Sequence, residues 1–386
     1  MAKSLIPKNK DPFFDMKVAL VHDYIREYGG AEGVLKTLTD LFPNAPIYTA
    51  FRVKGSTAAK EFKSQKIIES SLAPLLKIDN FYSPLRLLIP VIWRSFDLSS
   101  YDLVITSASW YVTRGFKVGP KTKVICYCHT PPRWLYGYET SVKFTKYWPV
   151  KIYAAIVGHF IRMYDFNSAQ KVDYFLANSK NVQARINKFY RRDSTVIYPP
   201  VEVEKIIDAT KDFVKENYFL SVSRLVGAKG LEEAAVLAKK LNFKLKIVGE
   251  TYGFADVQRE LEKLSGGHVE LLGRVSDQEL YTIYGKAKGF IALAKDEDFG
   301  MSVVEAQAAG TPVIAFNGGG FKESVIDGET GIFINDTDEK TMGSAIQKLN
   351  RIRWDKSKLQ TNAKRFSKER FEKEMNQFVN KRWQAK

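Results

Sequence analysis

Two glutamates, Glu297 and Glu305, enclose the seven residues Asp-Phe-Gly-Met-Ser-Val-Val, a spacing that could serve carbohydrate chemistry. Ser302 is a good helix N-cap residue, so we expect a helix to begin there, just after Gly300 and Met301. The backbone N–H groups of these three residues would then point out of the helix start, where an anion can bind. A carboxylate at Glu297 could accept hydrogen bonds from sugar hydroxyls, and one at Glu305 from the vicinal hydroxyls of a ribose. A simpler alternative for Glu305 is a capping box with Ser302.

Two cations mark a second candidate segment. Arg224 follows the apolar run Tyr218–Ser223, and Lys229 lies in the turn Gly-Ala-Lys-Gly that ends at Gly230. Both would lie at the carboxyl edge of a strand, where they could neutralise a leaving diphosphate through a planar guanidinium and a mobile ammonium. The alternative is that they are two solvated loop cations.

The first half of the chain offers weaker signals. Gly29 and Gly30 open the turn Gly-Gly-Ala-Glu between the run Val18–Val21 and a helical pattern, an arrangement that brings backbone close to a phosphate or a sugar. His129 follows the run Lys123–Cys128 in the sequence Cys-His-Thr-Pro-Pro-Arg. A glycine pair is as often a plain connector, and a lone histidine at a strand end is more often structural.

The elements that must hold these residues form two series. Short β-branched or aromatic runs alternate with amphipathic helical stretches, which predicts parallel βα units. The first series comprises Val18–Val21, Asp102–Thr106, Lys123–Cys128 and Asp173–Ala177; the second comprises Tyr218–Ser223, Lys244–Val248, Val269–Leu272, Phe290–Ala294 and Pro312–Phe316. Pro199 and Pro200 forbid helix between the series and predict a linker.

We therefore expect a leader at 1–15, one Rossmann-like domain at 16–198 and a second Rossmann-like domain at 199–365. A C-terminal helix at 366–386 could pack back on the first domain. The fold class is α/β, with two doubly wound parallel sheets facing a central cleft, where open parallel sheets bind ligands.

Composition excludes several classes of protein. Of the 386 residues, 45% are hydrophobic and 26% charged, as in globular enzymes. Residues 1–200 hold 29 Lys and Arg against 15 Asp and Glu, a net charge of +14, which favours a polyanionic partner such as an anionic membrane surface. With only Cys126 and Cys128, a disulfide framework is excluded and a zinc site is disfavoured. The longest uncharged apolar stretch, Ile152–Ile161, is half of what a bilayer needs.

Taken together, these motifs resemble family 4 (group 1) of the retaining glycosyltransferases, which have the two-domain GT-B fold. The similarity covers nearly everything from Met16 to the C-terminus, with Ser223 replacing the family's usual glycine. The resemblance implies that the domain at 16–198 binds the acceptor and that the domain at 199–365 binds the nucleotide-sugar. It implies that Arg224 and Lys229 hold the donor diphosphate, that Glu305 binds the ribose and that Glu297 and His129 lie near the transferred sugar. It also implies donor contacts from Gly29, Gly30, Val275, Phe299, Gly300, Met301 and Ser302, without metal or cofactor.

The implied function is retaining, metal-independent transfer of a hexose to a lipid-linked or polysaccharide acceptor. The segment Cys128–Leu135 resembles mannosyltransferases of bacterial surface polysaccharides and favours GDP-mannose, with a UDP-sugar as the alternative. The segments Ser71–Leu98 and Lys143–Arg162 mix apolar and cationic residues, so each is either a membrane-docking surface or core. We expect a cytoplasmic enzyme at the inner face of the membrane. Two rivals are a sugar-nucleotide epimerase and a non-enzymatic protein that binds sugar nucleotides or nucleic acid, although no nucleic-acid-binding motif is present.

Overall fold

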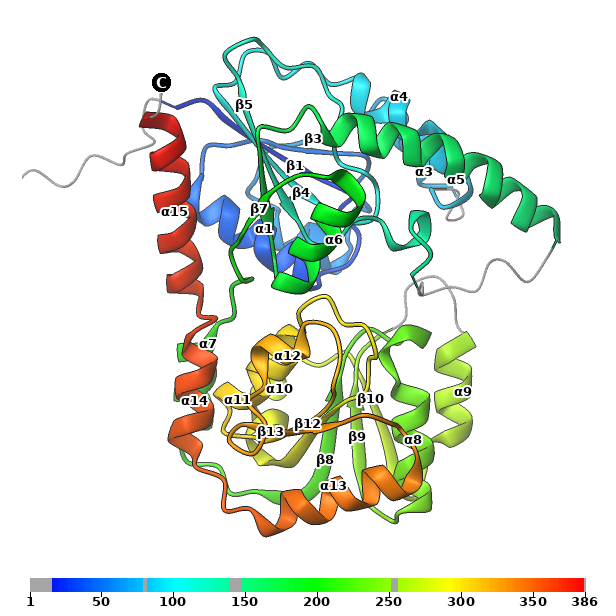
Figure 1. The fold of residues 1–386 in the computed structure, drawn as a ribbon, viewed down its shortest axis with the longest axis vertical. Helices are drawn as coiled ribbons and strands as arrows, with labels where there is room; N and C mark the ends of the chain where they lie inside the picture. Colours follow the sequence, from blue (N-terminus) through cyan, green and yellow to red (C-terminus); the bar gives the residue numbers. More distant parts are fainter. Residues whose placement is uncertain (1–15, 79–81, 139–147, 251–255, 385–386) are drawn as a thin grey trace, which may run out of the picture. The chain divides into compact units, whose positions relative to one another are not determined.

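The computed structural model describes residues 16–78, 82–138, 148–250 and 256–384 (Figure 1). Its contacts divide the chain into two compact units. The first contains the described residues of Met1–Cys128, Tyr164–Phe175 and Glu372–Lys386, and the second those of His129–Met163 and Leu176–Phe371. The expected leader at 1–15 lies outside the described residues, and the domain limits at 198 and 365 stay predictions.

A sheet of seven strands has the order β3-β2-β1-β4-β5-β6-β7. The strands are β1 (Val18–His22), β2 (Ile47–Thr49), β3 (Ile67–Glu69), β4 (Leu103–Ala108), β5 (Lys123–Cys128), β6 (Tyr174–Ala177) and β7 (Ser194–Val196). Strand β1 pairs in parallel with both β2 and β4 at the centre, and all five of its residues are buried. Because the strands are parallel, the residues that follow β1, β4 and β5 leave the sheet at one edge.

The second sheet has six strands in the order β10-β9-β8-β11-β12-β13. They are β8 (Glu216–Val222), β9 (Leu245–Val248), β10 (Val269–Gly273), β11 (Ala287–Ala292), β12 (Val313–Phe316) and β13 (Gly331–Ile334). Strand β8 pairs in parallel with β9 and β11. The loops after β8 and β11, which carry the predicted donor-site residues, therefore emerge side by side.

Helices connect the strands throughout the described chain. They are α1 (Gly30–Leu41), α2 (Thr57–Glu61), α3 (Ala73–Leu76), η1 (Pro84–Leu88), α4 (Ile89–Arg94), η2 (Arg133–Leu135), α5 (Trp148–Ala169), α6 (Lys180–Tyr190), α7 (Val203–Thr210), η4 (Gly227–Lys229), α8 (Leu231–Lys240), α9 (Asp256–Leu264), α10 (Asp277–Lys286), α11 (Met301–Ala308), α12 (Phe321–Ser324), α13 (Glu339–Arg351), α14 (Lys356–Lys364) and α15 (Lys368–Gln384). In the part of the chain that is described, no helix has both the length and the hydropathy needed to cross a bilayer.

The core of the second unit lies on both faces of its sheet, and alternate residues of β8 serve the two sides. Tyr218 and Leu220 belong to a cluster that includes residues of α7, α10 and α11. Phe219 belongs to a second cluster with residues of α8, α9 and α13. A strand buried on both faces reads as a continuous apolar run, which is why the sequence revealed it.

The expected two parallel α/β sheets are confirmed, and all nine predicted strands are present within two or three residues at each end. Four further strands, β2, β3, β7 and β13, were not predicted. Each has only three or four residues, and β3 and β7 are only partly buried, so neither length nor continuous hydrophobicity set them apart.

The segment Ser71–Leu98 divides between the two alternatives left open for it. Ile89, Ile92 and Trp93 of α4 are fully buried, and the Trp93 indole donates to the Tyr111 carbonyl at 2.8 Å. Leu87 and Val91 are instead exposed by 46% and 54%. One side of the segment is therefore core of the first unit, and the other side meets solvent.

Candidate functional site

The loops after β8 and β11 bring two predicted site residues into contact. The Lys229 ammonium donates to both carboxylate oxygens of Glu297, at 2.6 Å and 2.9 Å. Lys229 can reach across because Gly230 adopts a left-handed φ of +70° and lies against Leu293, where a Cβ would come within 2.7 Å of the Leu293 Cβ. The pair is about three-quarters or more buried, with side-chain exposures of 24% and 15%. A cation and a carboxylate are thus fixed together at the carboxyl edge of the sheet.

The acidic neighbours of Glu297 are held by two arginines. Arg133 donates to Asp298 Oδ1 at 2.8 Å, and Arg185 donates to the same oxygen at 2.5 Å. Arg185 also donates to a carboxylate oxygen of Asp296. Burial by itself would raise the pKa of Asp298, but the charges of Arg133 and Arg185 outweigh burial and hold that pKa below its usual value. Asp298 is therefore a stable anion.

The start of α11 differs from the sequence prediction. We expected Ser302 to cap the helix, but the N-cap is Gly300, with a φ of +90°, and the helix begins at Met301. That conformation favours glycine, and a side chain there would also collide with Phe321. With Ser302 already inside the helix, no capping box joins it to Glu305. The first turn carries no acidic residue, so the partial positive charge of the helix end is not offset there.

Three consecutive glycines allow another segment to lie in close backbone contact with the loop after β11. In Gly318-Gly319-Gly320, a Cβ on Gly319 would collide with the backbone of Glu297, and one on Gly320 with the Cα of Phe299. The Gly320 N–H donates to the Glu297 carbonyl at 2.8 Å. The sequence had indicated only a tight turn at this triplet. The structure gives it the further role of a close backbone contact beneath Glu297.

Glu305, the second glutamate, is engaged from α10 instead of by a cap. The Tyr284 hydroxyl donates to Glu305 Oε2 at 2.7 Å. Burial raises the pKa of Glu305, and the hydrogen bond from Tyr284 opposes that rise. Burial and the nearby carboxylate raise the pKa of Tyr284, so its hydroxyl remains a donor. The sequence did not single out Tyr284, because a tyrosine at this spacing in an amphipathic helix is ordinary.

The remaining predicted residues of the second unit differ in exposure. Arg224 is exposed just beyond β8, and Val275 is partly buried after Gly273, which ends β10 with a φ of +64°. Phe299 is 2% exposed, and its ring packs against those of Tyr198 and Phe366. Any contact that Phe299 makes with a ligand would therefore come from its backbone.

His129 also belongs to the second unit and is 8% exposed. The next residue, Thr130, accepts a hydrogen bond of 2.9 Å from Arg185, the same guanidinium that binds Asp298. The chain segment that begins at His129 is thereby tied to the loop that carries Glu297. The structure thus links the two residues predicted to lie near the reacting sugar.

The first unit contains the other glycine site. Gly29 is the N-cap of α1, and its N–H donates to Glu32 Oε2 at 2.9 Å, so Glu32 satisfies this donor. Glu32 Oε1 lies 3.3 Å from His22 Nε2, and His22 Nδ1 lies 3.0 Å from the Ser107 hydroxyl. Gly30 begins the helix. This buried polar chain fixes the glycine turn at the ends of β1 and β4.

Comparison with known proteins adds the family. The model described as "Glycosyltransferase Family 4" matches residues 28–205, and the one described as "Glycosyl transferases group 1" matches residues 202–368. Between them the two matches cover residues 28–368, which hold every predicted site residue but not strand β1. The chain belongs to the group 1, family 4 glycosyltransferases.

Individual members of this glycosyltransferase family resemble the chain over part of its length. It is 28% identical over 214 residues to the uncharacterized glycosyltransferase MJ1178 of Methanocaldococcus jannaschii. The matched region covers 55% of the chain and 59% of that relative. It is 32% identical over 193 residues to the O-antigen chain mannosyltransferase RfbU of Salmonella typhimurium. That matched region covers 48% of the chain and 53% of RfbU. The chain thus spans little more than half the length of these relatives.

A solved structure shares the same fold. Anabaena Alr3699/HepE, crystallised with UDP and glucose, superposes with a TM-score of 0.65 over 95% of this chain and 99% of that chain, at 16% identity. At that identity the likeness speaks for the fold alone. The two α/β sheets described above are the GT-B fold of this glycosyltransferase family.

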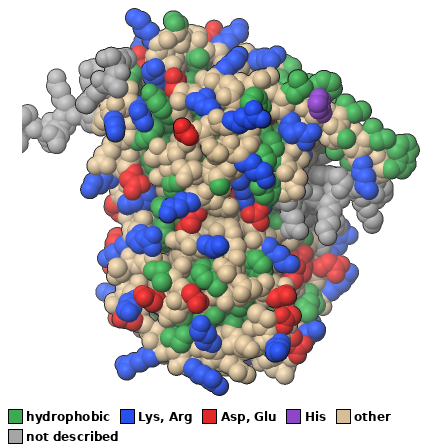
Figure 2. Space-filling view, in the orientation of Figure 1, with side chains coloured by type: hydrophobic (Ala, Val, Ile, Leu, Met, Phe, Trp, Pro, Cys, Tyr) green, Lys and Arg blue, Asp and Glu red, His purple; other side chains and the backbone are tan. Residues whose placement is uncertain are grey.

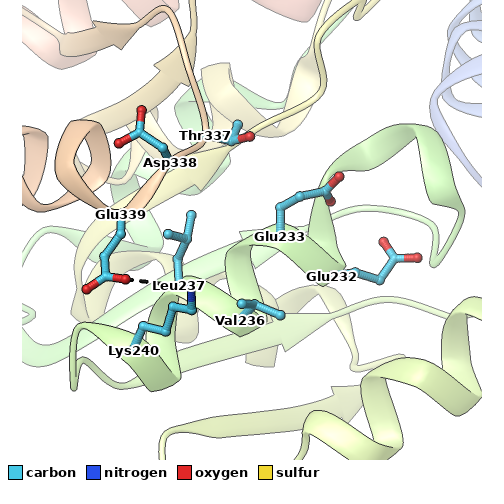
Figure 3. A pocket seen from close by; sticks show the side chains of 8 residues that line it. All are labelled: Glu232, Glu233, Val236, Leu237, Lys240, Thr337, Asp338 and Glu339. Carbon is cyan, nitrogen blue, oxygen red and sulfur yellow. Dashed lines mark ion pairs between the residues drawn. The ribbon is translucent and has the colours of Figure 1, made fainter.

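Other features of the described residues lie apart from this site. Figure 3 shows a hollow between α8 and α13, lined by Glu232, Glu233, Val236, Leu237, Lys240, Thr337, Asp338 and Glu339. None of the predicted site residues lines it, and the Lys240 ammonium pairs with Glu339 at 3.6 Å. Cys126 and Cys128 are buried, and burial raises the pKa of Cys126 to about 11. No group of three or more His, Cys, Asp or Glu in the described ranges is placed to hold a metal ion.

Proposed function

We propose that this protein transfers a hexose from a nucleotide diphosphate sugar to an acceptor hydroxyl, with retention of configuration and without a divalent metal. The observation that carries the proposal is the contact of Lys229 with Glu297 beside the start of α11, with Glu305 inside the same helix. The cation and the helix N-terminus suit a diphosphate. One carboxylate suits the hydroxyls of a ribose, and the other suits the hydroxyls of a sugar ring.

Departure of the diphosphate needs positive charge. In the proposed reaction the bond from the anomeric carbon to the diphosphate oxygen breaks, and a bond from the anomeric carbon to the acceptor oxygen forms on the same face. The acceptor proton passes to an oxygen of the departing diphosphate. Arg224, Lys229 and the N-terminus of α11 stabilise the developing negative charge, which is the contribution that a metal makes in other enzymes. Met301 and Ser302 supply the N–H groups.

Glu305, in the middle of α11, and Tyr284 are proposed to bind the nucleoside. With Tyr284 bound to Oε2, the Oε1 of Glu305 is the oxygen offered to the vicinal hydroxyls of the ribose. A ligand that requires the ionised carboxylate must overcome the burial that raises the pKa of Glu305. Val275 lies at the end of β10 and is proposed to contact the base.

His129 and Glu297 are proposed to contact the transferred sugar. Glu297 would accept hydrogen bonds from sugar hydroxyls once the diphosphate takes over Lys229. His129 would act from the segment after β5. The glycine turn at Gly29 and Gly30 is proposed separately as a donor contact. Neither is assigned as a covalent nucleophile, because in the proposed step the acceptor oxygen attacks the anomeric carbon directly, on the face that the diphosphate leaves.

The proposed donor is GDP-mannose, with a UDP-sugar as the alternative. The mannosyl donor is supported by the similarity to the mannosyltransferase RfbU and by the segment Cys128–Leu135. The UDP alternative is supported by the presence of UDP and glucose in the similar structure of HepE. The proposed acceptor is lipid-linked or a polysaccharide.

The proposed place of action is an anionic membrane surface, and helix α5 supports it. Large apolar side chains recur along α5 at every third or fourth position, which places them on one face of the helix. Their exposures are 73% for Trp148, 52% for Ile152, 55% for Ile156, 64% for Phe160 and 52% for Met163. Figure 2 shows hydrophobic side chains gathered along this helix, with Lys and Arg among them. An exposed apolar face in a basic chain suits the interface of an anionic bilayer.

Product analysis tests the proposed reaction. The protein is incubated with GDP-mannose or with UDP-glucose and a lipid-linked acceptor, and the released nucleotide and the anomeric configuration of the product are measured by chromatography and NMR. The proposal predicts stoichiometric release of one nucleoside diphosphate and retention at the anomeric carbon. Inversion would refute the retaining mechanism, and return of an epimerised sugar nucleotide would favour an epimerase.

A further inference from the structure

The loop that carries Glu297 is fixed to an unusual degree. All three consecutive carbonyls of the loop accept hydrogen bonds from outside it. Arg133 donates to the Asp296 carbonyl at 2.5 Å, and Ser179 donates to the Asp298 carbonyl at 2.6 Å. The Glu297 carbonyl accepts from Asn181 Nδ2 at 3.0 Å and from the Gly320 N–H at 2.8 Å. A loop residue ordinarily has freedom that Glu297 lacks.

Charge reinforces these backbone contacts. The side chains of Asp296 and Asp298 both pair with Arg133 and with Arg185. Arg185 is only 4% exposed and Arg133 is 15% exposed, so their charges are not screened by much solvent. Planar guanidiniums can bind carboxylates with two donors at once, which sets orientation as well as distance. We call Arg133, Arg185, Asp296 and Asp298 the arginine clamp.

The clamp has a consequence for Lys229. The charge of Lys229 contributes to the low pKa of Asp298, so that carboxylate lies within electrostatic range of the ammonium. Three cations, Arg133, Arg185 and Lys229, therefore face three carboxylates. If the arginines did not neutralise Asp296 and Asp298, these two anions would hold Lys229 and repel an incoming diphosphate.

We propose that Arg133 and Arg185 are positioning residues that hold the Glu297 carboxylate and keep Lys229 available for the donor diphosphate. The role given to Lys229 rests on the proposed function. The mechanical part of the inference, that the arginine clamp fixes the loop carrying Glu297, does not. Arg133 reaches the loop from the segment that begins at His129, and Arg185 from α6. The clamp thereby couples the His129 segment to Glu297 through side chains that touch no substrate themselves.

The mechanical part is tested by hydrogen exchange in the absence of any ligand. The backbone amide that reports on the loop is the Gly320 N–H, which binds the Glu297 carbonyl at 2.8 Å. In Arg133→Ala we expect the Gly320 amide to exchange faster than in wild type, by at least about tenfold. The matched control is Lys188→Ala, which removes an exposed cation from α6 without touching either aspartate. Equal Gly320 exchange in Arg133→Ala and in this control would overturn the clamp.

The functional part is tested by steady-state kinetics and pH. Arg133→Ala should lower kcat by about 100-fold, the cost of a displaced catalytic group, with a smaller change in the KM for donor. Without Arg133, burial should raise the pKa of Asp298, and because protonation removes its uncompensated charge, the variant should regain part of its rate as pH falls through that pKa. Adding Asp298→Asn should restore part of the lost rate, because it removes the uncompensated charge. A purely structural role for Arg133 predicts no rescue and no shift of the pH profile.

The outcomes separate the two levels of the argument. If wild type binds no nucleotide and turns over no donor, the proposed function fails, and hydrogen exchange still decides whether the clamp holds the loop. If wild type is active but Arg133→Ala keeps its kcat within about twofold and its pH profile unchanged, the positioning role is wrong. Melting temperatures of both variants guard against misfolding, and Arg185→Lys, which keeps the charge but not the planar fork, gives a milder second test.

Discussion

The Lys229 ammonium lies 2.6 Å from Glu297 Oε2, although the two residues are 68 positions apart in the chain. One comes from the loop after β8 and the other from the loop after β11, two neighbouring strands of the second sheet. In the proposed reaction the diphosphate competes with Glu297 for this cation. Because of that competition, removal of the Glu297 carboxylate should strengthen the binding of a diphosphate.

Replacing Glu297 by glutamine should strengthen the binding of a nucleoside diphosphate while it lowers the rate of transfer. The substitution frees Lys229 from its ion pair, whose contribution is about 1 kcal/mol or less, so the Kd should fall by up to roughly fivefold. Turnover should fall because the sugar loses a carboxylate contact. Isothermal titration and initial rates measure both effects. The control is Glu339→Gln, which breaks a pair with Lys240 at the hollow of Figure 3; weaker nucleotide binding in Glu297→Gln would contradict the competition.

Tyr284→Phe should shift the pH dependence of nucleotide binding. The ribose is proposed to bind the ionised form of Glu305, so affinity is lost as pH falls through the pKa of that carboxyl. Burial raises this pKa and the Tyr284 hydroxyl lowers it, so removal of the hydroxyl should raise it further and move the loss of affinity to higher pH. Titrations across pH measure the midpoint.

The control for this shift is Tyr218→Phe. Its hydroxyl donates to the Ile283 carbonyl at 2.7 Å, so the variant loses a hydrogen bond of the same kind without touching Glu305. Both variants should lose about 1 kcal/mol of unfolding free energy. If wild type and both variants lose affinity at one common pH, Tyr284 does not tune Glu305.

Gly320→Ala should destabilise the second unit and reduce turnover. The φ of Gly320 is −70°, so alanine meets no backbone strain there, but its Cβ would collide with the Phe299 Cα and the Asp298 carbonyl. Overpacking of this kind costs about 1–3 kcal/mol of unfolding free energy. Denaturant unfolding and initial rates check it against Gly343→Ala in α13, where the nearest atom is 3.6 Å away and a gain of up to about 1 kcal/mol is expected. Equal stability of the two variants would refute the close contact.

The double variant Ile156→Glu, Phe160→Glu should lose binding to anionic vesicles. Two apolar side chains that would enter the interface become charged, and burial of each is worth about 1.5–3 kcal/mol, so the partition coefficient should fall by about 100-fold or more. Co-sedimentation with phosphatidylglycerol vesicles measures it, and the melting temperature should not change because both sites are exposed. Val214→Glu, at a site 82% exposed outside α5, controls for one of the two added negative charges. Equal sedimentation of the two proteins would exclude α5 as the docking face.

The sequence could predict the strands and the site loops because their signals are local. Parallel strands such as β5 and β8 are buried over most of their length and contain apolar runs, and the loop after β8 carries glycine, Arg224 and Lys229. The same reasoning missed β3, whose residues are all only partly buried. A strand of three residues gains its stability from its neighbours, not from its own pattern.

The sequence could not predict the contacts that fix Glu297. Ser302 has the better N-cap side chain, but the φ of +90° at Gly300 and the packing of Gly318–Gly320 against the loop move the helix start to Met301. Arg133 and Arg185 lie more than 100 positions from Asp298, and no spacing rule joins them. The one available signal was that Asp296 and Asp298 flank Glu297, since three adjacent carboxylates require cations nearby.

Calorimetric titration of GDP, UDP and ADP into wild type and Lys229→Ala tests the central claim most directly. The account predicts that one of the three nucleotides binds wild type and that Lys229→Ala weakens its binding by about 10- to 100-fold, since a charge-assisted hydrogen bond contributes about 1.5–3 kcal/mol. Lys239→Ala, an exposed lysine of α8, should bind like wild type. If no nucleotide binds wild type, or if Lys229→Ala binds as tightly as wild type, the donor site is not at Lys229, Glu297 and Glu305.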